Sequence, residues 1–431
     1  MMKMELREGL PVRNEVKAGY KKTEIGIIPE DWEVISFEKA FYFLSTASYS
    51  RAEILKNGDI KYVHYGDIHT KLEHFLDFKN FELPTIKNEQ LKTYSLIKDG
   101  DLIMADASED YEGIGKSVEV KNIENDKGIS GLHTFLLRGK EGVFSNGFKA
   151  YLHSNKIIKT QYDKLATGLK VYGVSKGNLK SIQIPLPPLP EQKAIAQVLS
   201  DTDHLIQSLE KLIAKKRLIK QGAMQKLFNP KKGWVVKKLP QVCWFQEGPG
   251  LRNWQFTKNG MKVINVTNLV DGYLALEKTD RHISNKEFEK MYKHFEIDEN
   301  DIVMASSGNS YSKVAVVRKQ DLRLLMNTSV IRFKPLQGFD YNYLLIFLKS
   351  ALFKDQIDLL ITGGAQPNFG PFHLKKIDIA IPPTKEEQSS IASIISDMDA
   401  EIETLEKKQA KYKALKQGLM QNLLTGKIRL V

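Results

Sequence analysis

The stretch of sequence that decides the fold occurs twice in this chain. Residues 191–227 read EQKAIAQVLSDTDHLIQSLEKLIAKKRLIKQGAMQKL, and residues 387–423 read EQSSIASIISDMDAEIETLEKKQAKYKALKQGLMQNL. The two stretches are identical at 19 of 37 positions, without a gap. Unrelated segments of this composition would share about two or three residues. The chain therefore contains an internal repeat, which decides how its other motifs are interpreted.

Each copy has the spacing of a long amphipathic helix, with apolar residues in alternating steps of three and four. These residues are Ile195, Leu199, Ile206, Leu209 and Ile213 in the first copy, and Ile391, Ile395, Met398, Ile402, Leu405 and Tyr412 in the second. Such a helix extends about 55 Å and needs a partner, so we expect the two copies to pair antiparallel. Close backbone approach would explain Gly222 and Gly418, since glycine costs about 1 kcal/mol against alanine there. Two independent helices, each packed on its own domain, are the alternative.

The rest of the chain repeats more faintly. Lys116 falls opposite Lys313, and Arg138 falls opposite Arg332. Short segments rich in β-branched and aromatic residues predict strands, and they cover residues 60–68, 101–105, 133–138, 261–269, 301–305 and 328–333. Helices are predicted near residues 148–165 and 343–360. The predicted fold is α+β, with two repeated globular α/β domains joined by two long antiparallel coiled-coil helices about a pseudo-two-fold axis.

Composition narrows the class of protein. The 431 residues include 64 Lys and Arg against 52 Asp and Glu, a formal charge of +12 that favours a polyanionic partner such as nucleic acid. The single cysteine, Cys243, excludes an intramolecular disulfide framework and a multi-cysteine zinc site. No apolar run approaches the length of a membrane span, and the first residues lack a signal-peptide core. We therefore expect a cytoplasmic protein that does not enter a membrane.

Catalytic signals in the sequence are weak. Residues 115–117 read Gly-Lys-Ser, but Asp110 stands where a phosphate-binding loop needs glycine. Glu119 lies downstream of Asp106 with the acid spacing of some metal-dependent nucleases, yet the repeat places it opposite Val316. The histidines lack metal-ligand spacing, and the densest group is His64, His69 and His74. We predict no catalytic residue and no metal ligand in this chain.

Several segments resemble the specificity subunits of type I restriction-modification systems. They are residues 20–34 (YKKTEIGIIPEDWEV), 187–192 (PPLPEQ), 382–383 with 386–388 (PP and EEQ), 362–368 (TGGAQPN) and 423–429 (LLTGKIR). The resemblance covers nearly the whole chain, in the right order and in duplicate. One departure is that the first copy has no counterpart of the Gln-Pro-Asn part of residues 366–368.

The resemblance implies a DNA sequence-recognition subunit without catalytic activity of its own. Residues 1–186 would form a first target recognition domain and residues 230–383 a second, each reading one half of a bipartite, asymmetric site in double-stranded DNA. Residues 187–229 and 384–431 would form the coiled-coil spacer, which sets the gap and docks two methyltransferase subunits. Restriction subunits would join the larger complex. S-adenosylmethionine, ATP and magnesium would be used by these partners and not by this chain.

Candidate DNA contacts are polar residues in paired loops, because base edges are read by donors and acceptors while Lys and Arg contact phosphates. In the first domain they are Arg51, Ser108, Lys116, Lys170, Tyr172, Ser175 and Lys176. In the second they are Arg252, Asn253, Ser307, Asn309, Lys313, Gln366 and Asn368. The aligned Lys116 and Lys313 favour phosphate contact. Lys211, Lys215, Lys216, Arg217 and Lys220 either face the spacer DNA or form a solvated helix face.

Two other functions would fit parts of the pattern. A stand-alone metal-dependent DNA-cleaving enzyme would use carboxylates such as Glu119. A coiled-coil adaptor would bind protein but not DNA. The repeat with divergent domains favours the recognition subunit over both.

Overall fold

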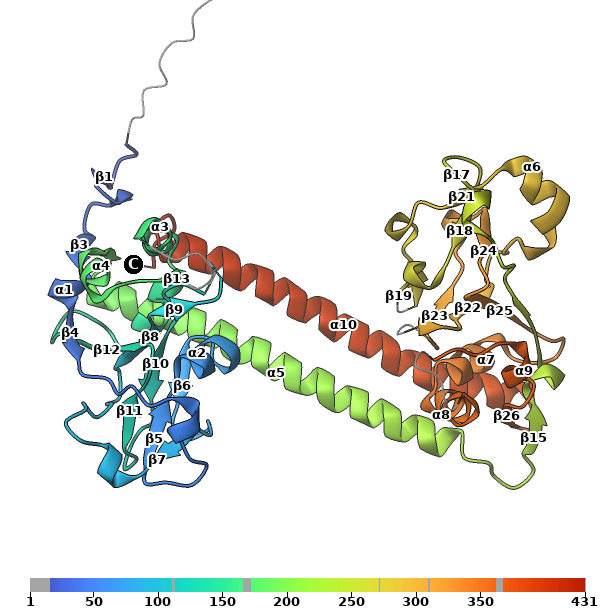
Figure 1. Cartoon of the computed structure of the whole chain (residues 1–431), viewed down its shortest axis with the longest axis horizontal. Helices are drawn as coiled ribbons and strands as arrows, with labels where there is room; N and C mark the ends of the chain where they lie inside the picture. Colours follow the sequence, from blue (N-terminus) through green and yellow to red (C-terminus); the bar gives the residue numbers. More distant parts are fainter. Residues whose placement is uncertain are drawn as a thin grey trace, which may run out of the picture. The chain divides into compact units, whose positions relative to one another are not determined.

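The computed structural model describes residues 16–110, 113–165, 172–270, 272–308, 311–361 and 367–430. Its longest elements are two helices, α5 (Leu189–Leu227) and α10 (Lys385–Leu423). The chain divides into two compact units, residues 16–210 with 408–430 and residues 211–407. Both divisions fall inside the long helices. Each unit therefore holds the first part of one helix and the last part of the other (Figure 1).

The first unit is built on a mixed five-stranded sheet of order β4-β12-β8-β10-β6. Its strands are β4 (Phe41–Leu44), β12 (Thr134–Gly139), β8 (Leu102–Ala105), β10 (Ser117–Lys121) and β6 (Phe75–Asp77). A three-stranded sheet holds β11 (Gly128–Ser130), β5 (Ile60–Val63) and β7 (Thr85–Ile86). Two-stranded pairs are β1 (Tyr20–Thr23) with β2 (Gly26–Pro29), β3 (Glu33–Ser36) with β14 (Gln183–Leu186), and β9 (Ala107–Ser108) with β13 (Tyr172–Gly173). The α-helices are α1 (Phe37–Ala40), α2 (Tyr65–Lys71), α3 (Lys156–Leu165) and α4 (Lys176–Ser181).

The second unit repeats this plan around a four-stranded antiparallel sheet of order β16-β25-β22-β23. Its strands are β16 (Cys243–Glu247), β25 (Val330–Pro335), β22 (Ile302–Ala305) and β23 (Val314–Val316). A second sheet holds β17 (Phe256–Thr257), β21 (His282–Ile283), β18 (Met261–Ile264) and β24 (Leu324–Met326). Two-stranded pairs are β15 (Val235–Lys238) with β26 (Asp378–Ile381) and β19 (Leu269–Val270) with β20 (Tyr273–Leu274). The shorter α-helices are α6 (Asn285–Glu287), α7 (Tyr341–Leu348), α8 (Ala351–Leu360) and α9 (Pro371–Leu374).

Most predicted strands are present, but two of them end early because a capping side chain starts a helical turn. The strand predicted over 60–68 stops at Val63, and the His64 ring accepts the Gly66 N–H over 3.1 Å to begin α2. The strand predicted over 261–269 likewise stops at Ile264, where Asn265 caps a 3-10 turn. A strand pattern does not reveal such a cap, because the apolar residues continue through it.

Both predicted shorter helices are split in two by similar caps. Asn155 separates a 3-10 helix (Lys149–Ser154) from α3, and its side-chain oxygen accepts the Ile157 N–H over 2.8 Å. Ser350 separates α7 from α8, and its hydroxyl accepts the Phe353 N–H over 3.2 Å. The positions of the two breaks correspond in the repeat.

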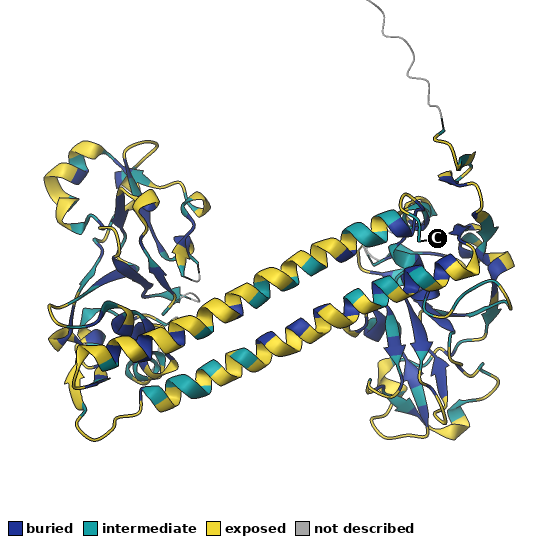
Figure 2. Cartoon of the chain, turned by 180° about the vertical axis from the view of Figure 1, so that it is seen from behind, coloured by how far each residue is buried: buried dark blue, intermediate teal, exposed yellow. Residues whose placement is uncertain are grey.

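Within each unit the long helices run antiparallel, as predicted. The ion pairs between them are Lys413–Glu210 and Lys416–Asp203 in the first unit, and Lys216–Glu401, Arg217–Glu406 and Lys220–Asp399 in the second. Later positions on one helix meet earlier positions on the other. The predicted apolar stripe is also buried in the middle of the helices, at Ile206, Leu209 and Ile213 of α5 and at Ile402 of α10. Figure 2 shows buried positions along both long helices. The alternative of two independent helices is therefore wrong.

The expected close approach at the two helix glycines is also wrong. A Cβ atom built at Gly222 or at Gly418 would meet no other atom within 4 Å. The helices approach through side chains instead. No contact in the described structure explains these glycines.

The repeated Glu-Gln dipeptide joins each long helix to its unit. The Trp32 indole N–H donates to the Glu191 carboxylate over 2.9 Å, and Trp234 donates to Glu387 over 3.2 Å. The next residues, Gln192 and Gln388, accept backbone N–H groups of Ser145 and Asp340 over 2.9 and 3.0 Å. The motif thus anchors the start of each helix to strands and loops that lie far away in the sequence. Among the described residues, no helix has the length and apolar character to cross a membrane.

Candidate nucleic-acid interface

One backbone arrangement recurs beside the main sheet of each unit. In the first unit, the Val174 N–H donates to the Asp106 carbonyl over 2.9 Å. In the second, the Phe369 N–H donates to the Ser306 carbonyl over 3.0 Å. Two loops distant in sequence therefore meet in each unit, residues 106–108 with 172–174 in the first and residues 306–307 with 368–369 in the second. These are called the paired loops. Their pairing brings together the predicted DNA-contacting residues Ser108 with Tyr172, and Ser307 with Asn368.

Ser108 is buried, which favours a structural role. Its hydroxyl accepts the Asp110 N–H over 3.3 Å. The space at Gly113 is closed to a side chain, because a Cβ there would lie 2.3 Å from the Ser108 Oγ. By contrast, Asn368 is exposed and Ser307 is half-exposed. The paired loops therefore offer more accessible polar groups in the second unit.

The aligned lysines occupy equivalent backbone positions but differ in their side chains. The carbonyls of Lys116 and Lys313 accept the N–H groups of Ala105 and Ala305, each over 2.9 Å. The Lys116 ammonium donates to the His69 carbonyl over 2.9 Å, and burial lowers the pKa of this lysine. Lys313 is exposed and pairs with no group in the described part of the chain. Of the two ammonium groups, only that of Lys313 is left without a partner among the described residues and is available to a phosphate.

Arg51 lies over the start of α2. A Cβ built at Gly66 would lie 2.6 Å from its guanidinium, so glycine there leaves room for the arginine. The same helix carries His69, whose ring nitrogen Nε2 is 2.8 Å from the Ala107 carbonyl. Helix α2 therefore connects the exposed Arg51 to the paired loops.

Ser175 and Lys176 begin helix α4. The Ser175 hydroxyl accepts the Asn178 N–H over 3.1 Å and caps the helix. The Lys176 ammonium lies 5.7 Å from the centre of the Phe43 ring. Both residues are exposed, and both have a local structural partner. Lys170, Asn309 and Gln366, which were also predicted to contact DNA, lie outside the described residues.

In the second unit Arg252 and Asn253 lie on an exposed turn, followed by a residue that the prediction missed. Trp254 is 80% exposed, the largest exposed fraction of any large apolar side chain described. The signal in the sequence that could have found it is its position directly after the predicted contacts Arg252 and Asn253. Such a ring suits stacking on a base or insertion between base pairs.

The prediction from the sequence also missed a cluster in the first unit, which is formed by Tyr65, Asp106 and His133. The His133 Nδ1 lies 3.2 Å from a carboxylate oxygen of Asp106, and its ring meets the Tyr65 ring edge-on at 5.4 Å. Burial raises the pKa of Asp106, while His133 opposes the rise. These residues come from three separate segments, so no local sequence pattern could have joined them.

Comparison with known proteins matches both halves of the chain to one family. Residues 29–216 and 231–413 match the type I restriction modification DNA specificity domain. The chain belongs to this family. Its function is accordingly the recognition of a DNA sequence for type I restriction-modification.

Relatives over the full length agree with this assignment. The type I restriction enzyme MjaVIII specificity subunit of Methanocaldococcus jannaschii is 26% identical, over 93% of this chain and 94% of its own length. The putative MjaX specificity subunit of the same organism is 27% identical, over 95% and 96%. The solved structure of the S subunit from M. genitalium has the same fold, with a TM-score of 0.53, 14% identity and coverage of 91% and 96%.

The carboxylate that suggested a metal-dependent nuclease, that of Glu119, has a structural role in this specificity subunit. Glu119 is buried, pairs with the Lys149 ammonium at 3.0 Å, and accepts the N–H groups of Gly147 and Ala150. It pairs in register with Leu102 at the start of β8, whereas Asp106 follows the end of that strand, four residues further along the chain. At about 3.3 Å per residue, that is too far for the two carboxylates to share one metal ion.

One group of the described residues has metal-ligand geometry: Glu73, His74 and Asp203. Lys416 already pairs with Asp203, and with Glu73 at 3.7 Å. The Tyr151 hydroxyl donates to the other Asp203 oxygen over 3.0 Å. The lysine thus supplies the positive charge that this cluster requires.

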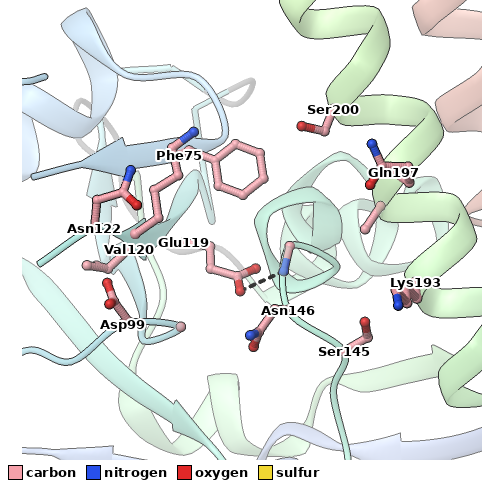
Figure 3. Close-up of a pocket in the computed structure, with 14 residues that line it drawn as sticks. Phe75, Asp99, Glu119, Val120, Asn122, Ser145, Asn146, Lys193, Gln197 and Ser200 are labelled. Atoms are coloured by element: carbon pink, nitrogen blue, oxygen red, sulfur yellow. Dashed lines mark hydrogen bonds between the residues drawn. The ribbon is translucent and has the colours of Figure 1, made fainter. Parts of the chain in front are cut away.

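A pocket of about 600 Å³ lies between the sheet of the first unit and the start of α5 (Figure 3). It is lined by Glu119 and Asn122 on the strand side and by Lys193, Gln197 and Ser200 on the helix side. The Glu119 carboxylate at its edge is held by the Gly147 N–H. The pocket borders the end of β10 opposite to Ser117, away from the paired loops.

Proposed function

We propose that each unit reads one half of a split, asymmetric DNA site, through residues 1–186 in one case and 230–383 in the other. The observation that carries this proposal is a common backbone with different side chains. The hydrogen bonds of Val174 to Asp106 and of Phe369 to Ser306 are equivalent. At these hydrogen bonds the first unit carries Asp106 with His133 beside it, and the second unit carries Ser306 with Ser329 beside it. Equivalent frames with different donors and acceptors would read different bases.

The long helices would form the spacer that sets the gap between half-sites and docks two methyltransferase subunits. Two observations support this role. Helices α5 and α10 each run for 39 residues without interruption, and inside both units they pair with each other in antiparallel orientation. Three cations of the predicted basic run, Lys216, Arg217 and Lys220, are engaged with the opposite helix. They are therefore less available to spacer DNA than Lys211 and Lys215, which are exposed.

The chain would act as a recognition subunit whose partners perform the chemistry. The partner methyltransferase would bind S-adenosylmethionine, and restriction subunits would use ATP and magnesium. The buried ion pair of Glu119 removes the main support for a stand-alone nuclease. Membership of the specificity family argues against an adaptor without DNA affinity.

The proposal is tested by co-expressing the chain with its cognate methyltransferase subunit in a host that lacks DNA methylation. We expect methylated bases in a two-part motif with a fixed gap. We also expect the binding constant for a duplex with that motif to fall steeply as salt rises. Lys313→Ala should reduce the slope of log K against log salt by about 1, whereas Lys258→Ala, at another exposed lysine of the same unit, should not. A soluble complex that neither methylates nor binds DNA would contradict the proposal.

A further inference from the structure

His133 is held in an unusual position beside the paired loops of the first unit. Its backbone lies in the left-handed region, with φ of 55°, which few residues other than glycine adopt. Its carbonyl accepts the Asp106 N–H over 3.1 Å, the same residue whose carbonyl binds Val174. The side chain remains 52% exposed. A half-exposed imidazole is thus fixed to the loop that the pairing creates.

Two contacts orient the ring. The Nδ1 atom lies 3.2 Å from a carboxylate oxygen of Asp106, and the Tyr65 ring packs edge-on at 5.4 Å. A carboxylate accepts but does not donate, so it selects the tautomer with the proton on Nδ1. The other nitrogen, Nε2, then carries a lone pair. Nε2 bonds to no group among the described residues.

An oriented acceptor at a DNA-recognition surface has a limited choice of partners. In the major groove, only the N6 amino group of adenine and the N4 amino group of cytosine donate hydrogen bonds. Guanine and thymine present acceptors there, which would face the Nε2 lone pair without a proton between them. We propose that His133 is a specificity-determining residue that accepts a hydrogen bond from the exocyclic amino group of one adenine or cytosine in the half-site of the first unit. Asp106 is its positioning residue.

At the equivalent positions of the second unit, the described residues hold two serines in place of the acid and the histidine, a difference that fits an asymmetric site. Ser329 occupies the position of His133, since the Ser306 N–H donates to its carbonyl over 2.9 Å. Ser306 occupies the position of Asp106, and its buried hydroxyl has no hydrogen-bond partner among the residues that the structure describes. The acceptor at Nε2 is therefore a feature of the first unit. Burial lowers the pKa of His64, and the nearby charge of Arg51 lowers this pKa further. The Arg51 guanidinium would bind a DNA phosphate beside the base that His133 contacts.

The inference rests on the proposed function and is tested with the full chain in complex with its methyltransferase. The wild-type complex first defines the two-part motif. Duplexes are then made in which each adenine of the first half-site is replaced by purine lacking the 6-amino group, and each cytosine by a pyrimidinone lacking the 4-amino group. We expect the wild-type complex to lose three- to tenfold in affinity at one of these positions, which is about the effect of one hydrogen bond. Removal of His133 should abolish that loss.

His133→Gly is the appropriate variant, because glycine adopts a positive φ without strain. Ser329→Gly is the matched control in the second unit. The His133→Gly complex should bind amino and deamino duplexes equally at the one position and keep its discrimination in the other half-site. Asp106→Ala, which keeps the imidazole but not its orientation, should lose part of the discrimination. Unfolding temperatures of all variants show whether they fold.

Different results would contradict the role of His133 and the proposed recognition of a two-part DNA site. Full discrimination at every position in His133→Gly would overturn the role of His133 while leaving a working recognition subunit. A wild-type complex without any two-part motif would instead overturn the proposed function. Loss of discrimination in both half-sites at once would also count against His133, because it would indicate a general effect on folding.

Discussion

Where the first unit buries Glu119, the second unit has Val316, and the two residues pair with the equivalent strand positions Leu102 and Ile302. Glu119 binds the Lys149 ammonium and two backbone N–H groups, whereas Val316 needs no partner. The same frame thus carries a buried ion pair in one unit and a partly exposed valine in the other. This frame therefore depends on backbone pairing and on the helix anchors that occur in both units, and it accommodates different side chains at equivalent positions.

The largest expected effect is on this buried ion pair. Glu119→Gln keeps the shape but leaves the Lys149 charge buried without a counter-ion, since both side chains are almost fully buried. We expect a loss of about 3–5 kcal/mol in the free energy of unfolding. Urea denaturation measures it, with hydrogen exchange in β10 assigning the loss to the first unit. Val316→Ala is the control, and protection unchanged in Glu119→Gln would refute the contribution of the pair.

The next comparison uses two lysines at equivalent positions of the repeat. Lys416 pairs with Asp203, which is buried and also binds Tyr151, while Lys220 pairs with the half-exposed Asp399. We expect Lys416→Met to cost about 3 kcal/mol, because it leaves a buried carboxylate unpaired. Lys220→Met should cost at most about 1 kcal/mol, as for exposed pairs. Thermal unfolding of the two variants measures both losses of stability. Equal losses would show that burial does not distinguish the two ion pairs.

Acid should weaken the first unit through two stacked histidines. Burial, followed by the charge of Lys416, lowers the pKa of His74 to about 3, and burial also lowers the pKa of His153 well below its ordinary value. Both rings stay neutral in the folded protein, whereas in the unfolded chain they take up protons near pH 6.5. Stability should therefore fall as the pH drops from about 6.5 towards 3, by about 2 kcal/mol for His74 between pH 7 and pH 5.

Hydrogen exchange at several pH values measures this effect in each unit separately. His74→Phe should retain the packing on Tyr151, whose ring centre lies 4.6 Å away, and should flatten the pH dependence of the first unit. His204→Phe, on the exposed face of α5, is the control. An equally steep dependence in His74→Phe would show that other groups titrate.

The smallest effect concerns the helix glycines and has the opposite sign. Gly222→Ala and Gly418→Ala place a methyl group where no atom lies within 4 Å. Each should stabilise the protein by about 0.5–1 kcal/mol, through helix propensity and a less flexible unfolded chain. A destabilisation in thermal unfolding would contradict this expectation, because it would show that the added methyl group meets neighbouring atoms.

The architecture could be predicted because it depends on repeated, local patterns. The spacing of Ile195, Leu199 and Ile391 predicted two long helices, and the structure confirms their pairing within each unit. The ends of strands β5 and β18 were missed, because one capping side chain, His64 or Asn265, decides them. The candidate site was the least predictable part. Its residues, such as Asp106 and His133, meet only through the fold, and the burial of Ser108 has no signature in its sequence.

The central claim is that two units on one frame read two independent half-sites. It is tested most directly by exchanging residues 230–383 for the corresponding region of another specificity subunit, and then mapping methylated bases in cells that express the hybrid with the methyltransferase. The account predicts a motif in which one half changes while the other half and the gap stay the same. A motif that changes in both halves, or in neither, would contradict it.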